Sequence, residues 1–333
     1  EIKHTPRLSP ELTFSTRVFF DSFGYSGKFA YPEEDDGLMN EHYRGLLVGS
    51  ELRADYEPLR WARFTLGGEY QFHFKNQAEG SSTSGLFLDE KHPYHSAAAF
   101  GIAHVDLFDW WSIQVGARLD ATYVSGLSTV PTPWSGGVSS AELEKICEVT
   151  KPDGPELKER DIPFISLNPR IAMRFRPFSE GTLKLMFGRA FRAASIYELT
   201  YNDGCLTQSP SPGLSEEAVY TGDIEYIHKL PKNFWLTLSS SLSVVENGIH
   251  QRETKNPLVI DGEENTVLYY THLDQPTHAL TAEVEVRKEF RQGWMVAAHY
   301  GYQITKHDNE AGLLQGGDVA NAPVHLAGAK FVL

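Results

Sequence analysis

The sequence contains little cysteine, no long apolar run and fewer basic than acidic residues. Only two of its 333 residues are cysteine, which excludes a small domain held by many disulfides and a cysteine-rich zinc site. No stretch approaches the roughly 18 consecutive apolar residues that a transmembrane helix needs, so a helical membrane protein is excluded. The 30 Lys and Arg residues face 44 Asp and Glu residues, which gives a net charge of −14. Because nucleic-acid binding depends on clustered cations, we expect no nucleic-acid partner.

Catalytic and metal-binding signatures are also missing. The sequence has no Gly-x-Ser-x-Gly, Ser-x-x-Lys or His-Glu-x-x-His motif, and these are the spacings that serine hydrolases and zinc proteases use. His92 and His95 are close in sequence, but they do not form a tight metal-ligand spacing with further ligands. We therefore predict no catalytic residue, no metal site and no bound cofactor.

The dominant pattern is an alternation of apolar and polar residues with a period of two. Between Trp111 and Tyr123 every odd-numbered residue is apolar or aromatic, whereas the even-numbered set includes Arg118 and Asp120. This run is far longer than the roughly 5–6 residues of an ordinary strand, and its length suits a tilted strand that crosses a bilayer. We expect about twelve such strands, at residues 11–30, 42–56, 60–76, 95–107, 111–125, 164–177, 182–194, 216–229, 234–250, 266–289, 294–306 and 322–333.

The connections between these strands alternate between short and long. Aromatic residues gather at the short ones, for example at Phe108–Trp111 and Phe290–Trp294. An outer-membrane barrel has short periplasmic turns, long extracellular loops and aromatic girdles, so all three features have one explanation. A soluble β-sandwich is the alternative, in which the loop lengths and the aromatic placement would be coincidences.

Six segments resemble motifs in the barrel of TonB-dependent outer-membrane receptors, and they occur in that family's order. Three of them depart from the family, with Ala194 in place of Pro, Thr281 in place of Gly and Thr221 in place of an inward Glu. The segments are Gly116–Asp120 (Gly-x-Arg-x-Asp), Asn168–Arg170 (Asn-Pro-Arg), Phe191–Leu199 (Phe-Arg-x-Pro-Ser…Glu-Leu), Leu214–Tyr226, Thr281–Glu285 (Gly-x-Glu-x-Glu) and Asn321–His325 (Asn-x-Pro-x-His).

The resemblance implies an all-β fold, an antiparallel transmembrane β-barrel. A complete barrel of this family has about 22 strands around a plugged lumen, so residues 1–333 are expected to be a barrel segment, with the plug domain and the terminal strands absent. A closed twelve-stranded outer-membrane barrel is the alternative. An open sheet in lipid would leave two unpaired edges, which the hydrocarbon region does not tolerate, and this favours the segment.

Several residues are candidates for contacts inside the lumen. Arg118, Asp120, Glu283 and Glu285 lie in the family's motifs on polar strand faces, and Asp223 lies on the face where the family has its inward Glu. The resemblance implies that they contact the plug through ion pairs. They can equally pair with one another and stay hydrated.

The long loops hold the remaining candidates. Cys147 and Cys205 both fall in predicted extracellular loops, and two cysteines in an exported chain suggest one disulfide between neighbouring loops. Two free thiols, or pairing with absent sequence, are the alternatives. Aromatic side chains in such loops can bind a planar or apolar ligand, and Tyr197, Tyr201 and Trp134 are the candidates.

The resemblance further implies active import across the outer membrane of a Gram-negative bacterium. The imported molecule would be a scarce, bulky nutrient such as an iron–siderophore, haem, a cobalamin or an oligosaccharide. The implied partners are the plug domain of the same full-length chain, the TonB–ExbB–ExbD energy complex, outer-membrane lipids and a small-molecule ligand such as a metal chelate. A passive porin is the alternative function, and a barrel enzyme is the least favoured.

Overall fold

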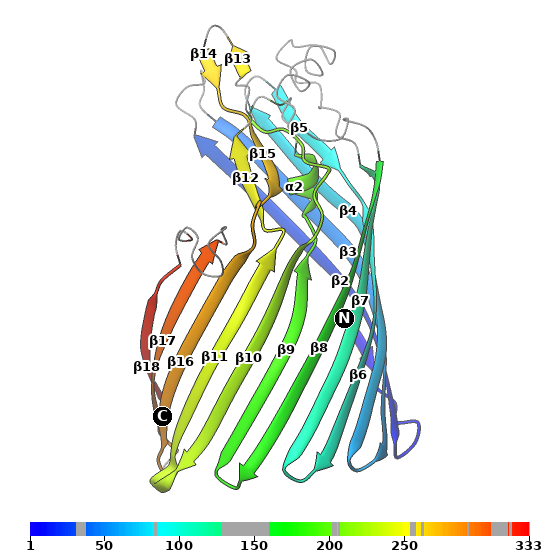
Figure 1. The fold of residues 1–333 in the computed structure, drawn as a ribbon. Coiled ribbons are helices and arrows are strands. Elements are labelled where there is room, and N and C mark those ends of the chain that lie inside the picture. The colour runs from blue at the N-terminus through cyan, green and yellow to red at the C-terminus, as the bar shows by residue number, and fades with distance from the viewer. Residues whose placement is uncertain are drawn as a thin grey trace.

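The structure is a computed structural model, and it is built almost entirely from antiparallel strands (Figure 1). It describes residues 1–30, 38–82, 85–127, 160–201, 205, 207–253, 258–260, 263–291, 293–307, 319 and 322–332. Among these residues no helix is long and apolar enough to cross a membrane.

One curved sheet holds most of the strands, and nearly all of them pair with their neighbours in chain order. The order is β1-β2-β3-β4-β6-β7-β8-β9-β10-β11-β16-β17-β18, with β5 added to β4, which makes a 14-stranded sheet. Within the described residues the two end strands, β1 and β18, do not pair with each other, so the sheet is open. Its strands are β1 (Ile2–His4), β2 (Leu12–Ala30), β3 (Leu38–Leu59), β4 (Ala62–Ser82), β5 (Gly85–Lys91), β6 (Tyr94–Phe108), β7 (Trp111–Leu127), β8 (Arg160–Phe178), β9 (Gly181–Arg192), β10 (Glu217–Leu230), β11 (Phe234–Glu246), β16 (Thr277–Glu289), β17 (Met295–His307) and β18 (His325–Val332).

Two of the predicted strands are each split into two. The expected strand 234–250 ends at Glu246, because Asn247 adopts a positive φ of 55° that extended backbone does not allow, and β12 (Ile249–Glu253) follows. The expected strand 266–289 is divided into β15 (Leu268–His272) and β16 before Thr277. Both β12 and β15 leave the main sheet and pair with each other, and β13 (Leu258–Ile260) and β14 (Glu263–Asn265) form another small hairpin above them (Figure 1).

The two faces of the sheet have opposite chemistry. The register connects Glu69, Ala98, Asp120 and Ser166 on successive strands, and this row lies on the polar face. The other face carries exposed apolar side chains, such as Leu66 at 66% and Ile165 at 68% exposure. In a soluble sandwich these side chains would form a buried core, whereas a lipid-facing surface requires them. We call the apolar face outer and the polar face inner.

The two ends of the strands also differ. The short turns β3–β4, β6–β7, β8–β9, β10–β11 and β16–β17 lie at one end, the lower one in Figure 1, where Phe108 and Trp110 stack with ring centroids 5.5 Å apart. The long connections lie at the opposite end, which we call the long-loop end. The buried apolar cluster of the described residues lies there too, and it contains Val124, Phe164, Ala194, Leu199 and Leu214.

Candidate functional site

A single helical turn, α2 (Ile196–Thr200), follows β9 at the long-loop end, and the Phe-Arg…Ser…Glu-Leu motif builds it. Ser195 caps the helix by accepting a hydrogen bond from the Glu198 N–H at 3.2 Å, and the Glu198 carboxylate accepts one from the Ser195 N–H at 2.7 Å. This is a capping box. Arg192 donates to both carboxylate oxygens of Glu198 at 2.8 and 2.9 Å, and Leu199 of the helix is fully buried in the apolar cluster with Val124. The motif therefore fixes where α2 sits.

The same contacts set the ionisation of Glu198. Its burial opposes ionisation, but the hydrogen bonds from Ser195 and the ion pair with Arg192 outweigh that effect and lower the pKa of Glu198. The carboxylate therefore stays charged at neutral pH. The helix–strand junction is held by a charged group that is itself mostly buried.

A cavity of about 310 Å³ lies between α2 and the inner face of the wall. Thr200 connects the two sides, because its hydroxyl lies 2.7 Å from the Glu90 carboxylate of β5. The predicted ligand residues Tyr197 and Tyr201 both line the cavity. The other lining residues are Phe23, Tyr43, Arg44, Gly45, Asn76, Gln77, Ala78, Glu90, His92, Ile196 and Thr200.

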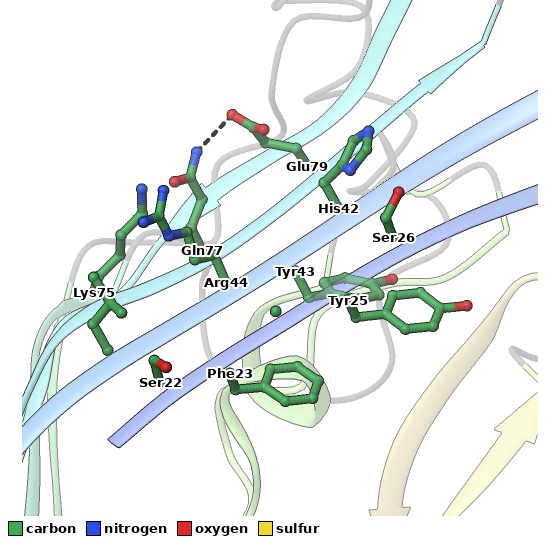
Figure 2. A pocket seen from close by; sticks show the side chains of 12 residues that line it. Ser22, Phe23, Tyr25, Ser26, His42, Tyr43, Arg44, Lys75, Gln77 and Glu79 are labelled. Carbon is green, nitrogen blue, oxygen red and sulfur yellow. Dashed lines mark hydrogen bonds between the residues drawn. The ribbon is translucent and has the colours of Figure 1, made fainter. Parts of the chain in front are cut away.

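Tyrosine rings from distant parts of the chain meet around this cavity. Tyr197 and Tyr201 lie with ring centroids 4.8 Å apart, and Tyr270 of β15 meets Tyr197 edge-on at 6.4 Å. On the wall, Tyr25 and Tyr43 stack at 5.5 Å, and Figure 2 shows both rings on the same side of β2 and β3. Burial raises the pKa of Tyr270, so its phenol stays protonated. The sequence identified the tyrosines of the loops, but it gave no reason to select Tyr25 and Tyr43.

His92 is the buried titratable group of the cavity. Its side chain is 6% exposed, its Nε2 lies 3.4 Å from Glu90 Oε2, and neither ring nitrogen has a hydrogen-bond partner within the described part of the chain. The nearby His95 points the other way and stacks on Phe72 on the outer face at 4.5 Å. The two histidines therefore do not form one site. The described residues contain no group of three or more His, Cys, Asp or Glu side chains arranged to bind a metal ion.

The predicted lumen residues Arg118 and Asp120 form part of a network on the inner face. Arg118 Nε donates to Asp120 Oδ1 at 2.7 Å, its Nη2 lies 3.4 Å from Glu69 Oε2, and Asn168 donates to Asp120 Oδ2 at 3.0 Å. Ala98 pairs in register with both Glu69 and Asp120, and its small side chain leaves room for Arg118 to reach across β6. Among the described residues, Arg118 is thus paired with Asp120 and Glu69, and the contact of these charges with a plug stays a prediction.

The other three predicted lumen residues, Asp223, Glu283 and Glu285, are not part of such an ion-pair network within the described ranges. The register places Asp223, Glu283 and Glu285 on the inner face, in line with the inward Glu225. None of the three has an ion-pair partner among the residues that the structure describes, whereas Glu225 binds Lys184 at 2.6 Å. Asp223 lines a second inner cavity of about 380 Å³. These carboxylates leave local negative charge on the inner face of β10 and β16.

Two predictions fall on residues outside the described ranges, Cys147 and Trp134. Cys205 is fully buried and is not a free thiol. The Cys147–Cys205 disulfide and the role of Trp134 both stay predictions.

The open antiparallel sheet, with its apolar outer face and charged inner face, defines a transmembrane β-barrel wall of the outer-membrane type. The family model described as "TonB dependent receptor-like, beta-barrel" matches residues 3–332. The chain therefore belongs to the TonB-dependent receptor β-barrel family, which is a family of transport receptors.

Solved structures share this fold at low sequence identity. The copper transporter OprC has a TM-score of 0.71 at 14% identity, with 92% of this chain and 46% of that chain covered. The ferric yersiniabactin uptake receptor FyuA from Yersinia pestis has a TM-score of 0.64 at 13% identity, with 98% and 45% covered. The siderophore receptor PiuA from Acinetobacter baumannii has a TM-score of 0.60 at 12% identity, with 98% and 50% covered. The chain thus spans about half the length of these proteins, and no curated protein matches it by sequence.

Proposed function

We propose that this chain forms the middle of the barrel of an outer-membrane receptor that imports a bulky nutrient actively in a Gram-negative bacterium. The observation that carries the proposal is the tyrosine-lined cavity at the long-loop end of a wall whose inner face is charged. A passive pore has no need of a built recognition site at its mouth. An importer of a scarce molecule needs one, because it must capture its ligand from dilute solution.

The chemistry of the cavity suits a metal chelate. Tyrosine rings offer flat apolar surfaces together with phenolic donors, and such groups bind planar or aromatic ligands. The copper, ferric yersiniabactin and siderophore specificities belong to the similar structures named above, and they make a chelate the first class to test. Haem, a cobalamin and an oligosaccharide are the further classes.

The inner face also suits a plug domain. Asp223, Glu283 and Glu285 have no ion-pair partner among the described residues, and cations on a plug in the remainder of the full-length protein would neutralise them. Residues 1–333 are then one segment of a larger barrel, and the TonB–ExbB–ExbD complex supplies the energy that moves the plug.

The test is uptake of labelled ferric siderophores by cells that lack the native receptor and express the full-length protein. We expect Tyr197→Ala with Tyr201→Ala to lower uptake about tenfold, because two aromatic contacts are lost. The matched control is Tyr123→Ala, since Tyr123 is 43% exposed on the outer face and away from the cavity. The control should transport at the wild-type rate.

Three other results would change the proposal. Uptake that persists in cells without the TonB complex indicates a passive porin. Wild-type uptake of chelates by the double tyrosine variant excludes the cavity as their binding site. No uptake of any metal chelate by the wild type, together with uptake of an oligosaccharide, moves the ligand class to carbohydrate.

A further inference from the structure

Two cationic side chains lie next to each other on the outer face near the long-loop end. Arg44 of β3 pairs in register with Gln77 of β4, and Leu46 pairs with Lys75, so Arg44 and Lys75 are diagonal neighbours on one face. Neither has an ion-pair or hydrogen-bond partner among the described residues. Two adjacent like charges repel each other, so an anion between them would be favourable.

A β-bulge puts Lys75 on this face. Below it Val48 pairs with Phe72, and above it Leu46 pairs with Lys75, so β4 contains one residue more than β3 at this point. Below the bulge the even-numbered residues of β4 face outward, and above it the odd-numbered residues do. Without the bulge Lys75 would face the lumen. The irregularity therefore brings a second cation beside Arg44.

The pair lies directly above outward-facing aromatic side chains of β2 and β4. Phe74 lies 6.4 Å from Phe20 and 6.1 Å from Phe72 between ring centroids, and Phe20 and Phe74 are strongly exposed. Aromatic belts of this kind mark the boundary between the hydrocarbon and the headgroups of a bilayer. Arg44 and Lys75 are therefore at the level of the headgroups.

The two cations line a groove of about 760 Å³, which Figure 2 shows from close by. Hydroxyl and amide groups of Ser22, Ser26 and Gln77 also line it. The carboxylate in the groove is Glu79, which accepts a hydrogen bond from Gln77 Nε2 at 2.6 Å and makes no ion pair with Arg44. With one carboxylate and two cations, the groove has a net positive charge on a strongly acidic chain.

We propose that this groove binds the phosphate of a phosphorylated lipid headgroup in the outer leaflet of the membrane. A guanidinium and an ammonium group are the usual protein partners of phosphate. The apolar aromatic surface immediately below then takes the acyl chains of the same molecule. A free phosphate ion has no apolar part that could bind to that aromatic surface, so the structure favours a lipid over soluble phosphate. The inference does not depend on what the receptor imports.

The test is native mass spectrometry of the full-length receptor mixed with lipid A that carries its phosphates, and with the same lipid after enzymatic dephosphorylation. We expect retention of the phosphorylated lipid only. Arg44→Gln and Lys75→Gln should each weaken retention about fivefold, and the double variant about 25-fold. The matched control is Arg60→Gln with Arg176→Gln, which removes two exposed cations at the short-turn end and should retain lipid A normally.

Two outcomes overturn the proposal. If both lipids are retained equally, or if the double variant retains lipid A as well as the wild type does, Arg44 and Lys75 do not bind the phosphate. Displacement of the lipid by millimolar inorganic phosphate shows a site for any free anion rather than for a lipid. Heat-modifiable migration on gels checks that each variant has folded, so a loss of retention is not confused with a loss of the barrel.

Discussion

Replacement of Arg189 should weaken the pairing of β8 with β9. The ladder between these strands ends at the pair Arg170–Gly188, beyond which β8 continues without β9 (Figure 1). The register puts Arg189 on the same face as Tyr220, the outer one. Its guanidinium nevertheless reaches the Ser166 hydroxyl at 2.6 Å and the Leu167 carbonyl at 3.1 Å, so it fills the junction where the ladder stops.

The magnitude follows from the ion pair that anchors this side chain. Arg189 Nη2 lies 2.6 Å from Glu216 Oε1, and the two side chains are only 13% and 19% exposed. Removal of one partner of a buried pair typically costs about 3–5 kcal/mol, since the other charge is left without compensation. We expect about 3 kcal/mol for Arg189→Met, and a smaller loss when Glu216→Leu is added, because no uncompensated charge then remains.

The assay is hydrogen–deuterium exchange of the full-length receptor in detergent. A loss of about 3 kcal/mol in local stability corresponds to roughly 100-fold faster exchange of the amides at Arg170 and Gly188. The matched control is Lys184→Met on the same strand. Its ion pair with Glu225 is equally short at 2.6 Å, but the side chains are 39% and 27% exposed, so the expected loss is about 0.5 kcal/mol. Equal exchange in the Arg189 and Lys184 variants would refute the reasoning.

Three further predictions concern other parts of the barrel. Gly67→Ala should destabilise it by about 1–3 kcal/mol, because a Cβ there would overlap the Phe100 ring, whereas Gly222→Ala meets nothing within 4 Å and should be neutral in thermal unfolding. The depressed pKa of Glu198 means that its stabilisation of α2 is complete above the ordinary carboxyl pKa of about 4.3 and is lost as the pH falls through the folded value. Protection of the α2 amides against hydrogen exchange should fall over the same pH range, and Glu198→Gln should remove this pH dependence. Cys147→Ser should abolish the mobility difference between reduced and non-reduced gels, and a difference that survives would exclude the predicted disulfide.

Local patterns in the sequence predict most of the strands, the two faces of each strand and the family, although they miss β5 and do not predict the breaks before β12 and β16. A period of two is a local property, so the alternation from Trp111 to Tyr123 already separates the lipid side from the lumen side. The motif residues Arg192, Ser195 and Glu198 are close in sequence and contact one another, so their arrangement also follows from a local pattern. The disulfide and the plug contacts stay predictions.

Contacts between residues that are distant in sequence depend on how the strands pair, and no local pattern contains that information. Tyr43 joins Tyr197 at the cavity, and Arg189 passes between two strands, because strand register and the end of a ladder depend on pairing across the sheet. Lys75 shows the same limit most clearly. The alternation of the residues before it in β4 predicts that the Lys75 side chain points inward. One extra residue of β4 opposite Leu47 turns that side chain to the outer face instead. A bulge is defined by two strands together, so neither strand's sequence reveals it alone.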